Sequence, residues 1–197
     1  MLVDLKALEQ RLAALPDDHP AGAEDCTHAA VAMILEAQPP ETRVWLMRRS
    51  EHQEDPWSGH ISLPGGRAAP GDADLLETAV RETLEEIGID LRRCARCLGS
   101  LPPLRAVAYG RLVPLVITPY VFAVETPIAP RPSAEAQEVF PLPLEAVASG
   151  ALDHVHHWRG DGAEGNLPSW RHDGRVVWGL TYRMLRSLLD VLRPPAT

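Results

Sequence analysis

One segment, from Asp74 to Gly88, constrains the fold of this chain more than any other. It opens with Asp74 followed by Glu77, a capping-box pattern with Asp in the place of Ser or Thr. It closes at Gly88, a residue type that can end a helix in the left-handed conformation. Apolar side chains recur between these ends at helical spacing. The sequence therefore predicts an amphipathic helix that begins after Asp74 and ends at Gly88.

Weaker patterns predict the elements around this helix. Leucines at helical spacing near the N-terminus indicate a helix of about four turns that ends before Pro16. Apolar, β-branched runs and short periodic segments predict strands at 29–35, 43–47, 61–63, 112–124 (one strand or two), 138–140 and 175–178, and helices at 144–148 and 181–192. The polar, Gly-rich stretch 153–170 is interpreted as a surface excursion. Strands and helices mix without a regular βαβ repeat, which favours an α/β sandwich with a mixed sheet in a single domain.

Composition narrows the class of protein. With 45% apolar and 23% charged residues, a chain of 197 residues has the make-up of one globular domain. The formal net charge of -8 disfavours general nucleic-acid binding through phosphate neutralisation. The first residues lack the apolar core of a signal peptide, and no stretch approaches the roughly 20 apolar residues of a transmembrane helix. We therefore expect a cytoplasmic protein without a membrane or nucleic-acid partner.

The predicted helix also concentrates negative charge. On a helical wheel, Glu82, Glu85 and Glu86 share an arc of roughly 100°. The apolar residues fall on the opposite side: Leu76, Val80, Leu84 and Ile87. Like charges at this spacing destabilise a helix, and the nearby basic residue is Arg81, four positions before Glu85. Either a solvated acidic face or a site for hard divalent cations explains the cluster, and spacing alone does not decide between them.

The residues around the cluster resemble a known motif. The stretch 66–89 is similar to the Nudix box, G-x5-E-x7-R-E-U-x-E-E-x-G-U, in which U is a bulky apolar residue. The matches, in order and spacing, are Arg81, Glu82, Glu85, Glu86, Gly88 and Ile89, preceded by Pro64-Gly65-Gly66. Thr83 stands at an apolar position, and the distance from Gly66 to Arg81 is one residue longer than the pattern. Asp72 replaces the early glutamate if the first spacing is kept, whereas Glu77 belongs to the cap.

This resemblance implies a fold, a reaction and a set of roles. The fold would be a Nudix-type α/β/α sandwich over 1–197, with an extra N-terminal helix and loop at 1–27 and a catalytic core at 28–192. The reaction would be hydrolysis of a pyrophosphate linkage with Mg²⁺ or Mn²⁺. Glu82, Glu85, Glu86 and the Gly66 carbonyl would bind the metal, and Arg81 would orient Glu85. Glu86 and Glu138 are the two candidates for the catalytic base.

A second resemblance concerns the substrate. Leu46-Met47-Arg48-Arg49-Ser50, followed by 59–66, is similar to the upstream signature of coenzyme A pyrophosphatases, approximately L-L-T-x-R-S-x3-R-x3-G-x3-F-P-G-G. The loop after it is one residue longer, Glu54 and Asp55 stand where an arginine is expected, and Leu63 replaces phenylalanine. The substrate implied is coenzyme A or acyl-coenzyme A, cleaved to 3′,5′-ADP and (acyl-)phosphopantetheine. ADP-ribose or a dinucleoside polyphosphate is the alternative, and a catalytically silent nucleotide-binding domain is a second one.

Several residues are candidates for substrate contact. They are Arg48, Arg49, Trp57, His60 and Arg67, with Arg105 and Arg111 as further phosphate-contact candidates. Trp57 either stacks on a base or anchors its own loop, and His60 either lines the site or makes a structural hydrogen bond.

Three other signals carry less weight. Cys94 and Cys97 have the spacing of half a zinc site or of a redox pair, but the chain has three cysteines and no second pair. The histidines at 154, 156 and 157 are interpreted as solvated loop residues. The N-terminal leucines either pack on their own domain or form a homodimer contact.

Overall fold

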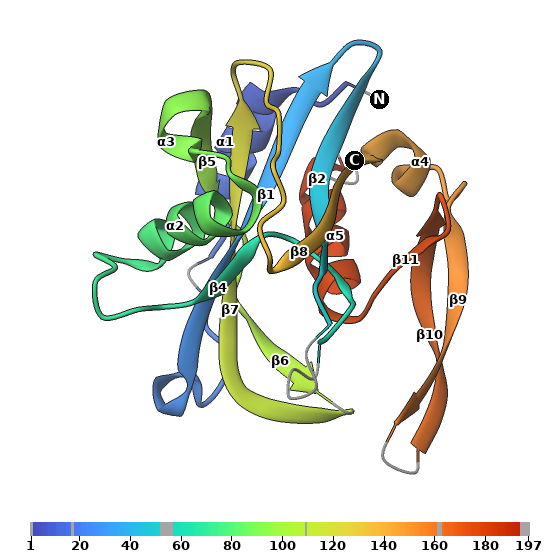
Figure 1. The fold of residues 1–197 in the computed structure, drawn as a ribbon. Coiled ribbons are helices and arrows are strands. Elements are labelled where there is room, and N and C mark those ends of the chain that lie inside the picture. The colour runs from blue at the N-terminus through green and yellow to red at the C-terminus, as the bar shows by residue number, and fades with distance from the viewer. Residues whose placement is uncertain (1, 17, 52–56, 109, 161–162, 194–197) are drawn as a thin grey trace.

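The apolar run at 29–35 forms the middle of β1 (Thr27–Gln38), the central strand of the fold (Figure 1). The computed structural model describes residues 2–16, 18–51, 57–108, 110–160 and 163–193. Strand β1 pairs in parallel with β7 (Arg111–Val124) and antiparallel with β2 (Glu41–Arg49) and β4 (Gly65–Arg67). Over the described residues these strands belong to an eight-stranded mixed sheet, whose other members are β3 (Ile61–Ser62), β5 (Ala95–Ser100), β6 (Leu104–Ala108) and β8 (Ala136–Pro143).

Helices cover both faces of this sheet, which explains why β1 is apolar on both sides. Val31, Met33 and Leu35 pack into one core cluster with α1 (Leu5–Ala13), α4 (Leu144–Ala148) and α5 (Gly179–Leu192). The alternate residues Ala30, Ala32 and Ile34 pack into a second cluster with α2 (Leu75–Ile87) and α3 (Leu91–Cys94). Figure 1 shows α2 and α3 together on one side of the sheet. The predicted α/β sandwich with a mixed sheet is confirmed.

The segment 112–124 forms one strand, although it contains two prolines. Strand β7 pairs with β6 up to Ile117 and with β5 from Tyr120 onward. Pro119 lies between these two ladders, where its missing N–H is not needed for pairing. Its carbonyl still accepts a hydrogen bond from the N–H of Leu101, at 2.9 Å. The strand therefore continues through the proline at the point where it changes partner.

The interpretation of 153–170 as a surface excursion is wrong. This segment lies in β9 (Asp153–Gly160) and β10 (Ala163–His172), which pair with β11 (Arg175–Trp178) in a separate three-stranded antiparallel sheet. Figure 1 shows this sheet standing beside the large one. Along β9 the exposed residues alternate with half-buried ones. The half-buried positions carry polar and aromatic residues instead of aliphatic ones, so polar composition concealed the strand period of two.

The N-terminal helix α1 is shorter than predicted, because its last turn loosens after Ala13. Its leucines pack on their own domain: Leu8 and Leu12 are 1% and 4% exposed. The Arg11 guanidinium donates to the carbonyls of Val191 and Leu192 at the end of α5, at 3.1 and 2.9 Å. Helix α1 therefore stabilises α5. Among the described residues, no helix is long and apolar enough to cross a membrane.

Candidate active site

Two consecutive glycines make room for the site, each for a different neighbour. At Gly65, with φ of 148°, an added Cβ would lie 2.2 Å from the Ala30 carbonyl oxygen, so glycine lets β4 lie against β1. At Gly66, an added Cβ would lie 2.4–2.6 Å from the carboxyl group of Glu82. Gly65 therefore allows two backbone strands to lie close together, and Gly66 leaves space for the carboxyl group of Glu82.

Helix α2 forms as its sequence predicts. The Asp74 carboxylate accepts a hydrogen bond from the Glu77 N–H at 2.8 Å, and Gly88 ends the helix with φ of 69°. The side chain of Glu77 pairs with Arg92 and not with Arg81, the partner of Glu82 and Glu85. Glu77 therefore belongs to the helix start.

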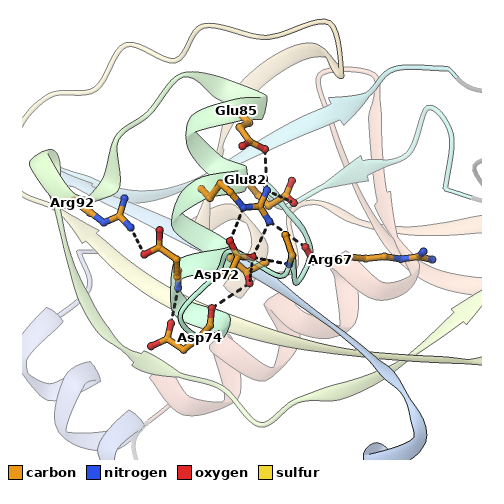
Figure 2. A network of polar contacts seen from close by, with 10 residues as sticks. Arg67, Asp72, Asp74, Glu82, Glu85 and Arg92 are labelled. Atoms are coloured by element: carbon orange, nitrogen blue, oxygen red, sulfur yellow. Dashed lines mark hydrogen bonds and ion pairs between the residues drawn. The ribbon is translucent and has the colours of Figure 1, made fainter.

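Arg81 is the centre of an ion-pair network that ties α2 to the preceding loop. Figure 2 shows its partners Asp72, Glu82 and Glu85. Its Nε and Nη2 donate to the two oxygens of Asp72, at 2.8 and 3.0 Å, a bidentate arrangement. Its Nη1 donates to Glu82 at 2.8 Å and to Glu85 at 3.0 Å. Nη2 also donates to the Arg67 carbonyl at 3.2 Å. The predicted contact with Glu85 is present, but the contact with Asp72 was not predicted.

Asp72 fixes the loop between β4 and α2. Besides binding Arg81, its carboxylate accepts hydrogen bonds from the Ala69 N–H at 2.9 Å and the Thr78 hydroxyl at 2.8 Å. These contacts, the Arg81 guanidinium foremost, hold the pKa of Asp72 well below its usual range. Asp72 thus supports the loop that precedes the helix.

Glu86 is buried, which the helical wheel did not predict. Its exposed fraction is 2%, and its carboxylate accepts a hydrogen bond from the Gly65 N–H at 2.7 Å. Burial raises the pKa of Glu86 to about 8, opposed by the Gly65 hydrogen bond and by the charge of Arg49, whose Nη1 lies 3.9 Å away. Burial also raises the pKa of Glu82.

The prediction that α2 packs through the stripe containing Leu84 is wrong at that residue, which is 46% exposed. The helix instead packs through a face that includes the small residues Thr78, Ala79 and Thr83 as well as Val80 and Ile87. Thr83 can be buried there because its hydroxyl donates to the Ala79 carbonyl at 2.7 Å. Because these side chains are small, α2 lies close to the sheet, and Glu86 is therefore covered by β4.

A cavity of about 1940 Å³ opens beside these carboxylates. Glu82, Glu86 and Gly66 line it, whereas Glu85, whose side chain is 57% exposed, does not. The cavity lies between the large sheet and the three-stranded sheet. Its other walls include Arg49, Trp57, His60, Arg67, Val107, Val113, Glu135, His156, Trp158, Trp178 and Arg183.

The predicted substrate-contact residues divide into two groups. Arg49, Trp57, His60 and Arg67 line the cavity, whereas Arg48, Arg105 and Arg111 are not among its lining residues.

Arg49 lines the cavity, whereas its neighbour Arg48, at an irregular point of the pairing between β2 and β8, does not. Arg48 donates through Nε to Glu138 at 2.9 Å. Glu138 also accepts hydrogen bonds from Arg175, at 2.8 and 3.1 Å, and these ion pairs lower its pKa. Glu138, the weaker of the two base candidates, therefore lies in a structural ion pair outside the cavity lining.

Trp57 anchors its loop and also contributes to the cavity wall. Its indole N–H donates to the Val107 carbonyl at 3.3 Å, which supports the anchoring interpretation. His60 packs against Trp178, with ring centroids 4.7 Å apart and the ring planes tilted by 55°. Glu54 and Asp55, the acidic residues of the variant upstream loop, lie outside the described residues.

With this geometry established, the comparison with known proteins can be interpreted. A description of the NUDIX domain matches residues 27–160, about two thirds of the chain. The chain belongs to the Nudix family. Pyrophosphatases that act on nucleoside diphosphate derivatives belong to this family.

Two curated relatives fall in the same family. The human "Mitochondrial coenzyme A diphosphatase NUDT8" is 35% identical over 141 residues, which cover 69% of this chain and 57% of that protein. The chain thus spans little more than half the length of that relative. The Yersinia enterocolitica "Uncharacterized Nudix hydrolase NudL" is 32% identical over 163 residues, covering 82% of this chain and 79% of that protein.

Solved structures confirm the Nudix fold. A Caenorhabditis elegans Ap4A hydrolase binary complex has a TM-score of 0.51 and 22% identity, covering 62% of this chain and 84% of that one. A MutT/nudix family protein from Enterococcus faecalis has a TM-score of 0.55 and 16% identity, covering 89% of this chain and 63% of that one. At these identities the likeness concerns the fold alone.

The Nudix box of this chain offers oxygen ligands, the kind that hard divalent cations prefer. Glu82 and Glu86 face the cavity from one helix, and the carbonyl of Gly66 belongs to the strand beside them. Within the described part of the chain, however, no three His, Cys, Asp or Glu side chains are gathered closely enough to hold one ion. Glu85 is held by Arg81 on the solvent side. The donor chemistry fits a divalent ion, and Glu85 must leave Arg81 to join the other two.

The sequence interpretation missed Glu135, which precedes β8 and lines the cavity. Its charge contributes to the raised pKa values of both Glu82 and Glu86. The signal that could have identified it is its place after the proline-rich loop, three residues before Glu138. The loop is brought to α2 by the pairing of β8 with β2 and by two backbone hydrogen bonds, from the Arg131 N–H to the Ile87 carbonyl at 2.8 Å and from the Ser133 N–H to the Glu86 carbonyl at 2.9 Å.

Proposed function

We propose that this Nudix hydrolase cleaves the pyrophosphate linkage of coenzyme A or acyl-coenzyme A, releasing 3′,5′-ADP and (acyl-)phosphopantetheine. The observation that carries the proposal is that Glu82 and Glu86 open onto a cavity of about 1940 Å³. Most small-molecule sites measure about 300–1,000 Å³, so this cavity suits a substrate with two large halves joined at the carboxylates. The upstream resemblance and the name of the human relative support coenzyme A in particular.

We propose Mg²⁺ or Mn²⁺ as the cofactor, since divalent ions are general in this family. Glu82, Glu86 and the Gly66 carbonyl would hold it, with Glu85 as a further ligand. A divalent ion at this place supplies positive charge to the bridging phosphates and makes water a stronger acid.

Side chains of α2 and of the loop before it would position the carboxylates. Asp72 holds Arg81 and Arg81 holds Glu82, so the Glu82 carboxylate is positioned before substrate arrives, whereas Glu85 would leave Arg81 to join a bound metal. The Gly65 N–H fixes one oxygen of Glu86.

Glu86 and Glu135 are our candidates for the base that accepts a proton from the attacking water. Glu86 has a pKa raised to about 8 by burial, and Glu135 is an exposed carboxylate that also lines the cavity. Glu138 is not retained, because two arginines occupy its carboxylate.

ADP-ribose or a dinucleoside polyphosphate is the second candidate substrate. One observation favours ADP-ribose: Asp25, Glu135 and Glu164 line the cavity, and such acidic residues repel the additional phosphate that distinguishes coenzyme A from ADP-ribose. A silent nucleotide-binding domain is less well supported, because all three box glutamates are present. A cytoplasmic location and a homodimer stay predictions, to be checked by cell fractionation and by light scattering after gel filtration.

One panel tests the proposal. The full chain is incubated with Mg²⁺ or Mn²⁺ and with coenzyme A, acyl-coenzyme A, ADP-ribose, dinucleoside polyphosphates or nucleoside triphosphates, and the products are identified. We expect 3′,5′-ADP and phosphopantetheine; inert coenzyme A beside a cleaved alternative would replace the substrate.

The roles of the glutamates need variants. We expect Glu86→Gln to abolish turnover while the protein stays folded, because a glutamine oxygen can still accept the Gly65 hydrogen bond. Near-normal activity in that variant would overturn the role of Glu86. Loss of turnover in Glu135→Gln as well would identify Glu135 as the second essential carboxylate.

A further inference from the structure

Three aromatic rings from distant segments meet on the cavity wall that faces away from α2. His156 of β9 lies 4.2 Å from Trp178, ring centroid to ring centroid, with the planes tilted by 31°. Trp178, at the end of β11, lies 4.7 Å from His60 of the loop before β3, at 55°. All three residues line the cavity. We refer to His60, His156 and Trp178 as the ring cluster.

The ring cluster is not part of the hydrophobic core. The small sheet has a separate aromatic pair for that purpose, in which Trp170 of β10 is 1% exposed and lies 4.2 Å from Tyr182 of α5. Trp170 belongs to the large core cluster, whereas His156 and Trp178 are only half-buried and belong to neither of the two clusters. Aromatic surface left open to a cavity can take a flat ligand by stacking.

The charge state of His156 favours a neutral ligand group over a phosphate. Burial lowers the pKa of His156 first of all, and the positive charges of His154 and His157 lower it further. The ring is therefore more readily uncharged than an ordinary histidine at neutral pH, which suits stacking rather than ion pairing with a phosphate. His154 and His157 have polar partners of their own, Arg171 at 2.9 Å and Asn166 at 2.6 Å.

We propose that the ring cluster is a stacking site for the planar base of the nucleoside half of the substrate. This inference rests on the proposed function only in requiring a nucleotide substrate, whichever one it is. His60 and His156 lie within residues 27–160 and Trp178 lies beyond them, so the site combines the part of the chain that the NUDIX description matches with β11, which follows it. Bases stack on aromatic side chains whatever their sequence, because every base has a π-face. The three-stranded sheet thereby orients the substrate while α2 holds the reacting phosphates.

The test compares a ligand that has a base with one that lacks it. AMP and ribose 5-phosphate are titrated calorimetrically into the 197-residue chain without substrate turnover. Stacking of one base on aromatic side chains changes affinity by roughly 5- to 100-fold. We expect the wild-type chain to prefer AMP by a factor in this range, and His156→Ala and Trp178→Leu to remove most of the preference.

The matched control is His154→Ala. This residue is also a half-buried histidine of β9, two positions away, but it does not line the cavity. It should keep the wild-type preference, and Trp178→Phe, which retains an aromatic ring, should keep most of it. Circular dichroism checks that each variant is folded. If Trp178→Leu does not fold, the comparison of His156→Ala with the wild type tests the stacking site.

Three results would overturn the site: no preference for AMP in the wild type, an unchanged preference in His156→Ala, or equal weakening of both ligands. These results are separable from the fate of coenzyme A. If coenzyme A is inert but the preference for AMP disappears in His156→Ala, the substrate proposal fails and the stacking site stands.

Discussion

Gly66 allows the carboxylate geometry to be disturbed without removing a carboxylate. In Gly66→Ala the new Cβ would lie 2.4 Å from Glu82 Cδ, and ordinary contact begins at 3.4 Å, so the Glu82 carboxyl must withdraw by about 1 Å. A misplacement of this size at a catalytic centre costs on the order of 100-fold in rate. Stability should change by less than about 1 kcal/mol, because the atoms that move are the end of a flexible side chain and Gly66 does not need a positive φ. We therefore expect kcat/KM to fall about 100-fold while the melting temperature barely changes.

Gly71→Ala is the matched control. Gly71 lies in the loop that follows β4, and an added Cβ there meets no atom within 4 Å. Both variants and the wild type are compared in metal-dependent hydrolysis, in Mn²⁺ affinity by calorimetry and in thermal unfolding. The reasoning is refuted if Gly66→Ala keeps wild-type activity and Mn²⁺ affinity, or if Gly71→Ala loses as much of either.

Three further substitutions probe the structure around the site. Gly65→Ala should lower the free energy of unfolding by about 2 kcal/mol or more, because φ of 148° strains any residue with a side chain and the Cβ meets the backbone of β1; an unchanged denaturant midpoint would contradict this. Asp72→Asn should destabilise the protein at pH 7. The folded-state pKa of Asp72 is depressed, so the stability that its carboxylate contributes is present above about pH 4 and is lost as the pH falls further. The variant should therefore lose less stability than the wild type between pH 4 and pH 2. Parallel curves of stability against pH for the two proteins would exclude this role. Glu138→Gln should leave kcat unchanged and lower stability by about 1 kcal/mol or less, as for other partly exposed ion pairs; complete loss of turnover would restore Glu138 as a base.

The elements that the sequence predicted well are those that local interactions determine. Helix α2 has its cap at Asp74 and its left-handed end at Gly88, and both act within one turn of the chain. The helical wheel was less successful, because it gives the direction of each side chain but not the partner that will cover it. Glu86 is buried since β4 supplies the Gly65 N–H, and Leu84 is exposed because no element packs over it.

The parts of the site that could not be predicted are assembled by long-range pairing. Glu135 faces the carboxylates of α2 because β8 pairs with β2, and His156 meets Trp178 because β9, β10 and β11 form one sheet. Neither pairing has a local sequence signal. In β9, the inward positions carry histidines and a tryptophan where aliphatic residues would mark a strand. The same positions that concealed the strand provide the polar and aromatic wall of the cavity.

The two departures of this chain from the Nudix box compensate each other. Aspartate is one methylene shorter than glutamate, so Asp72 in an unchanged loop would reach less far toward Arg81. The spacing between Gly66 and Arg81 is one residue longer than the pattern, and the carboxylate of Asp72 meets Arg81 at 2.8 and 3.0 Å. The same carboxylate accepts the Ala69 N–H and the Thr78 hydroxyl, which links the loop to the start of α2. The shorter side chain of Asp72, in a loop that is one residue longer, therefore makes the bidentate contact with the Arg81 guanidinium. Arg81 in turn remains in position to hold Glu82 and Glu85. The altered spacing is thus a different way to build the same carboxylate support, rather than a sign that the support has been lost.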